Sequence, residues 1–167
     1  MEILDILILG SGPAALCLAS ELAKQNLNIK GISTKSPYEK WGNTYGIWAS
    51  ELEEFGLASL LSHRWSKTVS YFGDGIKDKG NNPTKHCYDY GLINQEAFQN
   101  ELLKTCKGIQ WLNETAKLIK SENKISEVIC LSGLKLKARL VIDASGHKSK
   151  FIKRPFSREV AQQAAYG

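Results

Sequence analysis

The sequence predicts an α/β fold built around a parallel sheet, and the order of its first elements carries this prediction. An apolar strand pattern over residues 3–9 leads into the turn Gly10-Ser11-Gly12-Pro13-Ala14-Ala15. A helical pattern over 13–25 and a second strand pattern over 27–33 follow. This β-α-β unit has the size of a parallel crossover, about 30 residues. A later strand pattern over 139–146 ends in a turn of small residues.

The first strand is rich in branched apolar residues, which is typical of a strand buried on both faces. Pro13 stands at the first helical position, where its missing N–H costs no hydrogen bond. Beyond the second strand we expect a loop over 34–50 and a helix over 51–61. Two strands over 66–73 and 88–93 are expected to pair with each other around a polar tip at 74–86.

Asn94 is a suitable N-cap for a helix over 95–107, and residues 108–112 read as the next strand. Three short segments then predict an antiparallel β-meander with turns at "ENK" and "SG". Their expected ranges are 115–121, 125–132 and 134–139.

The turn after the first strand follows the pattern G-x-G-x-x-G/A, which predicts a site for a dinucleotide phosphate. The first glycine permits the tight turn and the second lets the backbone approach a pyrophosphate. Ala15 takes the third position, where helix and strand pack together, and the helix N-terminus adds unpaired N–H groups. The alternative is a glycine-rich turn with a structural role alone.

The acidic residue that binds a ribose in such sites is missing, because no Asp or Glu occurs between Glu21 and Glu39. Ser33 and Thr34 stand at the end of the second strand instead. Their hydroxyls either bind the ribose more weakly or are ordinary polar loop residues. Lys35 beside them would suit a 2′-phosphate.

Composition narrows the class of protein. A net charge of +5 fits an anionic cofactor or an anionic membrane surface, and we expect no nucleic-acid partner. No apolar run approaches the roughly 18 residues of a membrane span, and no secretory signal is visible. We expect no metal site, and scattered thiols in the reduced state at Cys17, Cys87, Cys106 and Cys130.

Several motifs resemble a known family. As G-x-G-P-A-G/A, the turn at 10–15 resembles flavoprotein FAD-binding folds, and "LVIDASG" at 140–146 resembles their second FAD motif. The stretch 90–103 resembles the helix ahead of their next parallel strand. Residues 41–57, "WGNTYGIWASELEEFGL", are similar to the W-x-N-x-Y-G-x-W segment of plant- and cyanobacterial-type lycopene cyclases. "QQAAYG" at 162–167 resembles the point where those proteins continue.

This resemblance implies a Rossmann-like FAD-binding fold with a parallel sheet, an antiparallel β-meander and part of a substrate domain. Residues 1–48 would form the βαβ FAD-binding segment, 49–93 a substrate-domain insertion and 94–146 the rest of the FAD-binding segment. Residues 147–167 would begin a truncated C-terminal part. The implied cofactor-binding residues are Gly10, Ser11, Gly12, Pro13, Ala14, Ala15, Ser33, Thr34, Asp143 and Gly146.

On the substrate side, the resemblance points to Asn43, Tyr45 and Trp48, which would lie near the flavin ring or the entrance for a polyene. The alternative is a packed aromatic loop with turn glycines. Glu51, Glu53 and Glu54 are carboxylates at a spacing more typical of a solvated helix face. No catalytic residue is assigned, because in this family the acidic candidate lies in the part that is missing here.

The implied activity is cyclisation of lycopene to β- or ε-rings without net electron transfer, with FAD as cofactor and NAD(P)H as reductant. We expect peripheral association with the cytoplasmic side of a membrane, because a C40 hydrocarbon resides there. The basic run 147–158 would either touch anionic lipid or form a solvated loop.

Two alternatives to a lycopene cyclase stay open. One is a related FAD-dependent monooxygenase or prenyl reductase, and the other is a non-catalytic nucleotide-binding fragment. The fragment alone is expected to be inactive.

Overall fold

The computed structural model describes residues 2–70, 83–147 and 149–152. They fall into two compact units. The first unit contains the described residues of 1–15, 25–36 and 109–167, and the second contains those of 16–24 and 37–108. The predicted substrate-domain insertion, 49–93, lies within the second unit.

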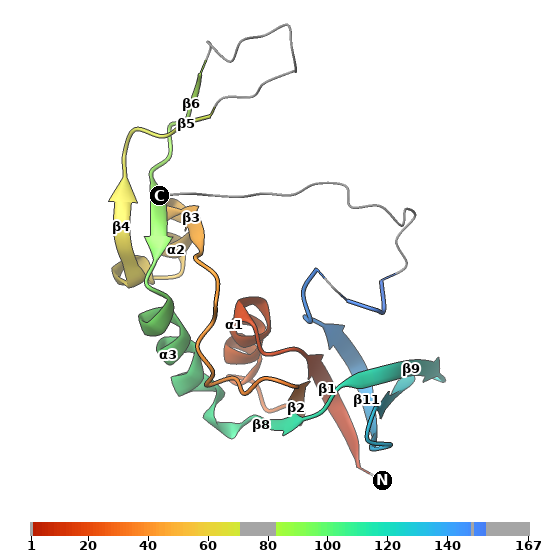
Figure 1. The fold of residues 1–167 in the computed structure, drawn as a ribbon. Helices are drawn as coiled ribbons and strands as arrows, with labels where there is room; N and C mark the ends of the chain where they lie inside the picture. Colours follow the sequence, from red (N-terminus) through yellow and green to blue (C-terminus); the bar gives the residue numbers. More distant parts are fainter. Residues whose placement is uncertain (1, 71–82, 148, 153–167) are drawn as a thin grey trace, which may run out of the picture. The chain divides into compact units, whose positions relative to one another are not determined.

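A six-stranded sheet forms the first unit and confirms the predicted α/β class (Figure 1). The first four strands in spatial order run parallel to one another, and the remaining two continue the sheet in antiparallel pairing from the fourth. In spatial order the strands are β8 (Gln110–Asn113), β2 (Ile29–Ser33), β1 (Ile3–Leu9), β11 (Lys135–Asp143), β10 (Ile125–Cys130) and β9 (Ala116–Glu122).

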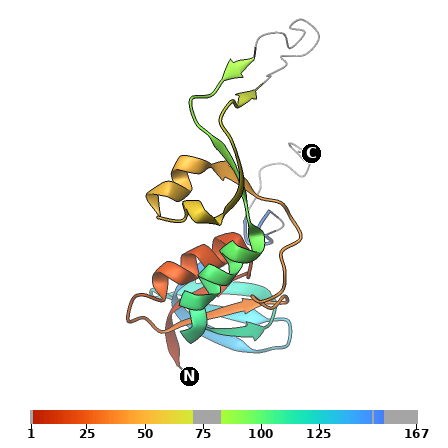
Figure 2. The ribbon, with the colours of Figure 1, turned by 90° about the vertical axis from the view of Figure 1, so that its left-hand side faces the viewer.

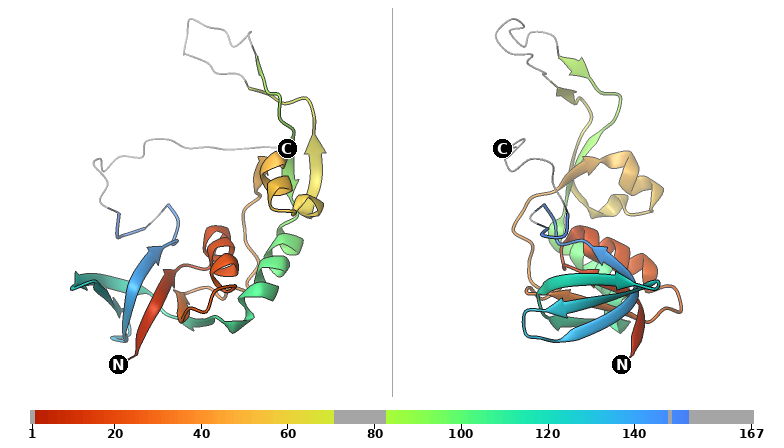
Figure 3. Two further views of the ribbon diagram at one scale, coloured as in Figure 1. Left: turned by 180° about the vertical axis from the view of Figure 1, so that it is seen from behind. Right: turned by 90° about the vertical axis from the view of Figure 1, so that its right-hand side faces the viewer.

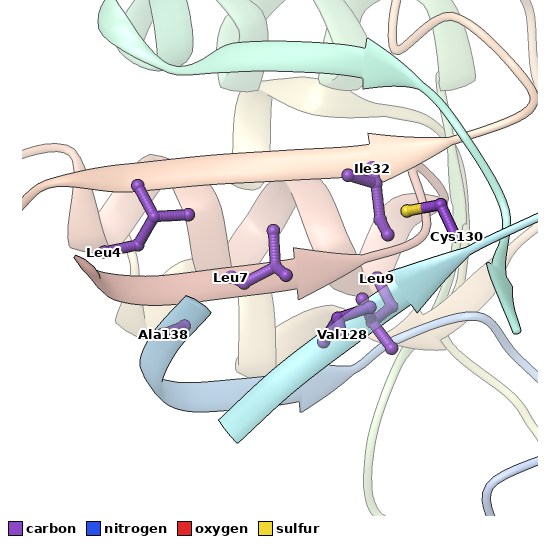
Figure 4. Close-up of a cluster of buried hydrophobic side chains, with 7 residues drawn as sticks. All are labelled: Leu4, Leu7, Leu9, Ile32, Val128, Cys130 and Ala138. Carbon is purple, nitrogen blue, oxygen red and sulfur yellow. The ribbon is translucent and has the colours of Figure 1, made fainter. Parts of the chain in front are cut away.

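β1 lies inside this sheet, between β2 and β11. Successive side chains of a strand point to opposite faces of the sheet, and Leu7 and Ile8 are both fully buried, so β1 is covered on both faces. Figure 4 shows a cluster of buried side chains around β1, to which β2, β10 and β11 contribute. Its members are Leu4, Leu7, Leu9, Ile32, Val128, Cys130 and Ala138.

The antiparallel meander is confirmed, with one correction (Figure 3). Residues 134–139 and 139–146 were expected to be two strands, but 135–143 form the single strand β11. One edge of β11 pairs with β10 and the other with β1, which explains the length. Asn123 and Lys124 adopt positive φ at the predicted "ENK" turn, and Gly133 does so at the "SG" turn.

Two helices belong largely to the second unit. α1 (Pro13–Leu22) begins after β1 at the predicted proline, and α3 (Gln95–Thr105) begins after Asn94. The Asn94 side chain accepts a hydrogen bond from the Ala97 N–H, which confirms the predicted N-cap. A 3₁₀ turn, η2 (Cys106–Gly108), ends α3, and the Cys106 thiol donates to the Leu16 carbonyl.

A three-stranded antiparallel sheet forms the rest of the second unit, with α2 beside it (Figure 2). Arg64 joins the two, because its guanidinium pairs with Glu53 of α2 and with Asp89. The elements are β3 (Gly46–Trp48), β7 (Tyr90–Ile93), β4 (Leu61–Trp65), α2 (Ala49–Glu54) and the 3₁₀ turn η1 (Ala58–Leu60).

Three predictions in this unit are wrong. The loop expected over 34–50 contains β3, and α2 begins at Ala49. The helix expected over 51–61 ends at Glu54, because Gly56 takes a left-handed conformation with φ of 69°. The strand at 88–93 pairs with β3 and β4, not with the strand expected over 66–73. There, β5 (Val69–Ser70) pairs with β6 (Thr84–Lys85), and part of the expected hairpin lies outside the described residues.

The buried cluster makes a direct prediction about stability. Leu7→Ala removes a fully buried side chain from the central strand and should lower the free energy of unfolding by about 2–5 kcal/mol. Leu118→Ala is the control, because that leucine is 44% exposed at the edge of the same sheet. Chemical denaturation of both variants measures the difference. Equal losses would contradict the assignment of β1 to the core.

Candidate functional site

A cavity of about 600 Å³ lies in the first unit, at the carboxyl ends of β1 and β2 and beside the turn after β11. Its walls are segments 9–14, 32–35, 114–116 and 144–146, with Lys150 and Phe151. In open α/β sheets, ligands bind outside the carboxyl ends of the parallel strands. The volume lies within the range of organic-ligand pockets, about 300–1,000 Å³.

Gly10 makes the turn into this cavity possible. Its φ is 107°, and an added Cβ would come within 2.5 Å of the Ala144 carbonyl oxygen. The Gly10 N–H donates to the Ile32 carbonyl at 2.8 Å, and the Ala144 N–H donates to the Leu9 carbonyl at 2.9 Å. The chain leaving β1 is therefore fixed to both neighbouring strands, and only glycine fits there.

Gly12 is different, because the protein itself does not require a glycine there. Apart from its neighbours in the chain, no described residue has an atom within 4 Å of an added Cβ, and the φ of Gly12 is not in the left-handed region. Gly12 also lines the cavity, directly before the start of α1. In dinucleotide sites, a closely approaching phosphate group uses the space beside this glycine.

The other predicted residues of the turn divide into two groups. Ser11, Pro13 and Ala14 line the cavity together with both glycines. Ala15 does not line it and is fully buried, as expected for the position where helix and strand pack together.

The predicted residues at the end of β2 also reach the cavity. Ser33, Thr34 and Lys35 all line it. The Ser11 hydroxyl donates to the Lys35 carbonyl at 2.9 Å and lies 2.9 Å from the Ser33 hydroxyl. Ser11 is only 8% exposed, so this contact between the glycine turn and the end of β2 is largely shielded from water.

Asp143 does not line the cavity but organises the loop that does. Its carboxylate accepts hydrogen bonds from the Ser145 N–H at 3.1 Å and from the hydroxyls of Ser145 and Ser149. Partial burial by itself would raise the pKa of Asp143, but these hydrogen bonds outweigh it and hold the pKa below its usual value. Gly146, the other predicted residue of this loop, lines the cavity.

Sequence reasoning missed several cavity residues. Glu114 and Thr115 follow β8, whose carboxyl end lies beside that of β2. The predicted strand at 108–112 was a usable signal, because the loop after a parallel strand reaches this edge of the sheet. Lys150 and Phe151 come from the basic run, and both line the cavity. The other basic residues after Phe151 lie outside the described part of the chain.

The residues predicted on the substrate side all lie in the second unit. Asn43 is exposed, and the Tyr45 ring packs edge-on against the buried Trp41 at 5.9 Å. Trp41 also contacts Phe98 of α3. The alternative of a packed aromatic loop therefore describes Trp41 and Tyr45 well.

Trp48 belongs to a row of rings across the three-stranded sheet. It stands opposite Tyr90, which stands opposite Trp65, with ring centroids 5.6 and 6.3 Å apart. His86 packs on Trp48 at 5.1 Å, and His63 packs on Trp65 at 4.3 Å. Trp65 and Tyr90 are 45% and 38% exposed, so this row presents aromatic surface to solvent.

Two further observations concern only the described residues. None of their helices is long and apolar enough to cross a membrane. No group of three or more His, Cys, Asp or Glu side chains is arranged there to hold a metal ion.

The fold and the cavity define the class as an α/β protein with a dinucleotide-type phosphate turn. The family is shown by sequence: the model described as "Lycopene cyclase protein" matches residues 5–167, and the chain belongs to this family. A lycopene beta cyclase of Synechococcus elongatus is 44% identical over 98% of the chain, and a neoxanthin synthase of Solanum lycopersicum is 33% identical over 98%. The chain spans 38% and 32% of the lengths of these relatives.

Solved structures show the same fold at low sequence identity. p-Nitrophenol 4-monooxygenase PnpA of Pseudomonas putida DLL-E4 matches 90% of the chain with a TM-score of 0.64 and 18% identity, over 43% of its own chain. A variant of the halogenase PltM, solved in complex with FAD, matches 86% with a TM-score of 0.61 and 16% identity, over 34% of its own chain. These matches confirm the predicted Rossmann-like fold.

The two turn glycines should respond differently to a methyl group. Gly10→Ala places Cβ against the Ala144 carbonyl in a left-handed conformation and should lower the free energy of unfolding by more than about 1 kcal/mol. Gly12→Ala should leave it within about 0.5 kcal/mol of the wild-type value. Urea denaturation compares the two variants. A large loss for Gly12→Ala would show that the fold itself needs this glycine.

Asp143 should contribute to stability only where its carboxylate is ionised. Its pKa in the folded chain lies below the ordinary value of 3.8, so its contribution is present above pH 3.8 and is lost as pH falls through the lower folded pKa. Asp143→Asn should therefore flatten the fall in unfolding free energy at acid pH. Denaturation from pH 5 to pH 2 tests this, and parallel curves for the two proteins would contradict it.

Proposed function

We propose that this chain supplies the FAD-binding part of a lycopene cyclase, which converts end groups of lycopene to rings in carotenoid biosynthesis. The observation that carries the proposal is Gly12, which lines the cavity and has open space where a side chain would stand. Membership of the lycopene cyclase family supports the reaction, and the FAD complex of a structural neighbour supports the cofactor.

The residues around the cavity fit the adenosine diphosphate half of FAD. The turn at 10–15 offers backbone N–H groups at the start of α1 to a pyrophosphate. Lys35 and Lys150 line the same cavity and add positive charge, while the end of β2 carries hydroxyls. A dinucleotide entering here meets one acidic side chain among the lining residues, that of Glu114.

The proposed reaction is an isomerisation that balances without an oxidant. A proton adds to an end double bond of lycopene, the resulting cation closes a ring, and loss of a proton forms the ring double bond. Reduced FAD, when bound, supplies a negative charge that stabilises such a cation. Within this chain, the turn and the 144–146 loop bind and orient the cofactor. The proton donor is not assigned to any residue of the chain.

The remaining parts of the proposal concern the surroundings of the reaction. We infer NAD(P)H as the reductant of FAD, and peripheral association with a membrane because the substrate is a C40 hydrocarbon. The net charge of +5 favours an anionic surface. Two of the relatives, from Solanum lycopersicum and Solanum tuberosum, are named neoxanthin synthase.

Expression of the full-length protein in lycopene-producing bacterial cells tests the proposal. We expect carotenoids with β- or ε-rings, and at least about a tenfold lower yield with Gly12→Ala, because its methyl group would occupy the space of the phosphate. Gly108→Ala is the matched control, since its Cβ also meets no protein atom and Gly108 does not line the cavity.

Unchanged lycopene, with wild-type protein made and soluble, would refute the proposed reaction. Hydroxylated products would favour a monooxygenase, and hydrogenated products would favour a prenyl reductase. Equal yields from wild type and Gly12→Ala would refute the proposed phosphate position.

A further inference from the structure

The end of β2 holds a closed ring of hydrogen bonds. The Ser11 hydroxyl donates to the Lys35 carbonyl at 2.9 Å, and the Lys35 N–H donates to the Ser33 hydroxyl oxygen at 3.2 Å. The two hydroxyl oxygens lie 2.9 Å apart. Ser11, Ser33 and Lys35 are thereby joined, although Ser11 and Ser33 are 22 residues apart in the sequence.

The direction of each bond in this ring follows from counting protons. A serine hydroxyl has one hydrogen, and that of Ser11 is used by the Lys35 carbonyl. The bond between the two serines must therefore use the hydrogen of Ser33. Ser33 thus donates to Ser11 and accepts from Lys35, so its hydrogen is not available to a ligand.

Thr34 is in the opposite situation. It lines the cavity and is exposed, and no hydrogen bond engages its hydroxyl within the described residues. Ser33 and Lys35, its two neighbours, are both members of the ring. The backbone on either side of Thr34 is therefore fixed, while its hydroxyl can still donate and accept.

From this contrast we infer that Thr34 contacts the ribose of the adenosine half of the cofactor, and that Ser33 ties the glycine turn to the end of β2 without contacting the ribose. The inference rests on the proposed function, because it takes FAD as the ligand. It also assigns different roles to the hydroxyls of Ser33 and Thr34, which the sequence alone does not distinguish. A neutral hydroxyl here replaces the carboxylate that usually binds a ribose in such folds.

The test compares two nucleotides with the full-length protein. ADP and 2′,3′-dideoxy-ADP differ only in the ribose hydroxyls, and each is titrated to displace FAD, followed by flavin fluorescence. For wild type we expect ADP to bind about 3- to 10-fold more tightly than the dideoxy nucleotide, because one neutral hydrogen bond increases affinity by about this factor. Thr34→Val and Thr34→Ala each remove the hydroxyl. Each should therefore bring the ratio of the two affinities to about 1.

Two variants distinguish contact with the ribose from a role in holding the glycine turn. Thr34→Ser keeps the hydroxyl and should keep the wild-type ratio. Ser33→Ala removes the link between the end of β2 and the glycine turn, which both nucleotides use through their phosphates. It should therefore weaken both nucleotides by a similar factor and leave the ratio unchanged. A role of Ser33 in direct ribose contact would instead lower the ratio in Ser33→Ala.

The inference is overturned if the ratio survives in Thr34→Val and Thr34→Ala, or if wild type already binds the two nucleotides equally. It is also overturned if Ser33→Ala alone removes the ratio. Failure of the proposed function is a different result, since wild type would then bind neither FAD nor ADP.

Discussion

The close packing of Gly10 against Ala144 is the constraint on which the rest of the site depends. β1 runs between β2 and β11, and the chain must leave it without colliding with either. The left-handed conformation of Gly10 permits this, and an added Cβ would lie 2.5 Å from the Ala144 oxygen. Hydrogen bonds to Ile32 and from Ala144 fix the turn on both sides. β1 is also the most buried strand of the sheet. The same strand therefore stabilises the fold and sets the position of the turn that lines the cavity.

Beyond this turn, hydrogen bonds of side chains fix the loops that form the walls of the cavity. Ser11 reaches from the turn to the end of β2, where it joins Ser33 and Lys35. Asp143, at the end of β11, holds the following loop through Ser145 and Ser149. Each of these loops therefore has a defined shape before any ligand binds. Preorganisation of this kind lowers the entropic cost of binding.

Several elements in both units could be predicted because local rules decide them. The glycine turn, Pro13 and the Asn94 cap each have one physical reason that needs no distant contact. The role of Asp143 could not be predicted, since the sequence does not show that its carboxylate bonds to Ser149. The strand pairing in the second unit could not be predicted from local sequence either. β7 pairs with β3 and β4, and this pairing depends on tertiary packing.

Hydrogen exchange of the full-length protein, with and without FAD, tests the central claim most directly. That claim is that three segments jointly bind the dinucleotide: the turn at 10–15, the end of β2 and the 144–146 loop. It predicts that FAD slows amide exchange most strongly in those three segments. Protection confined to β3, β7 and β4, with unchanged exchange at the turn, would contradict it.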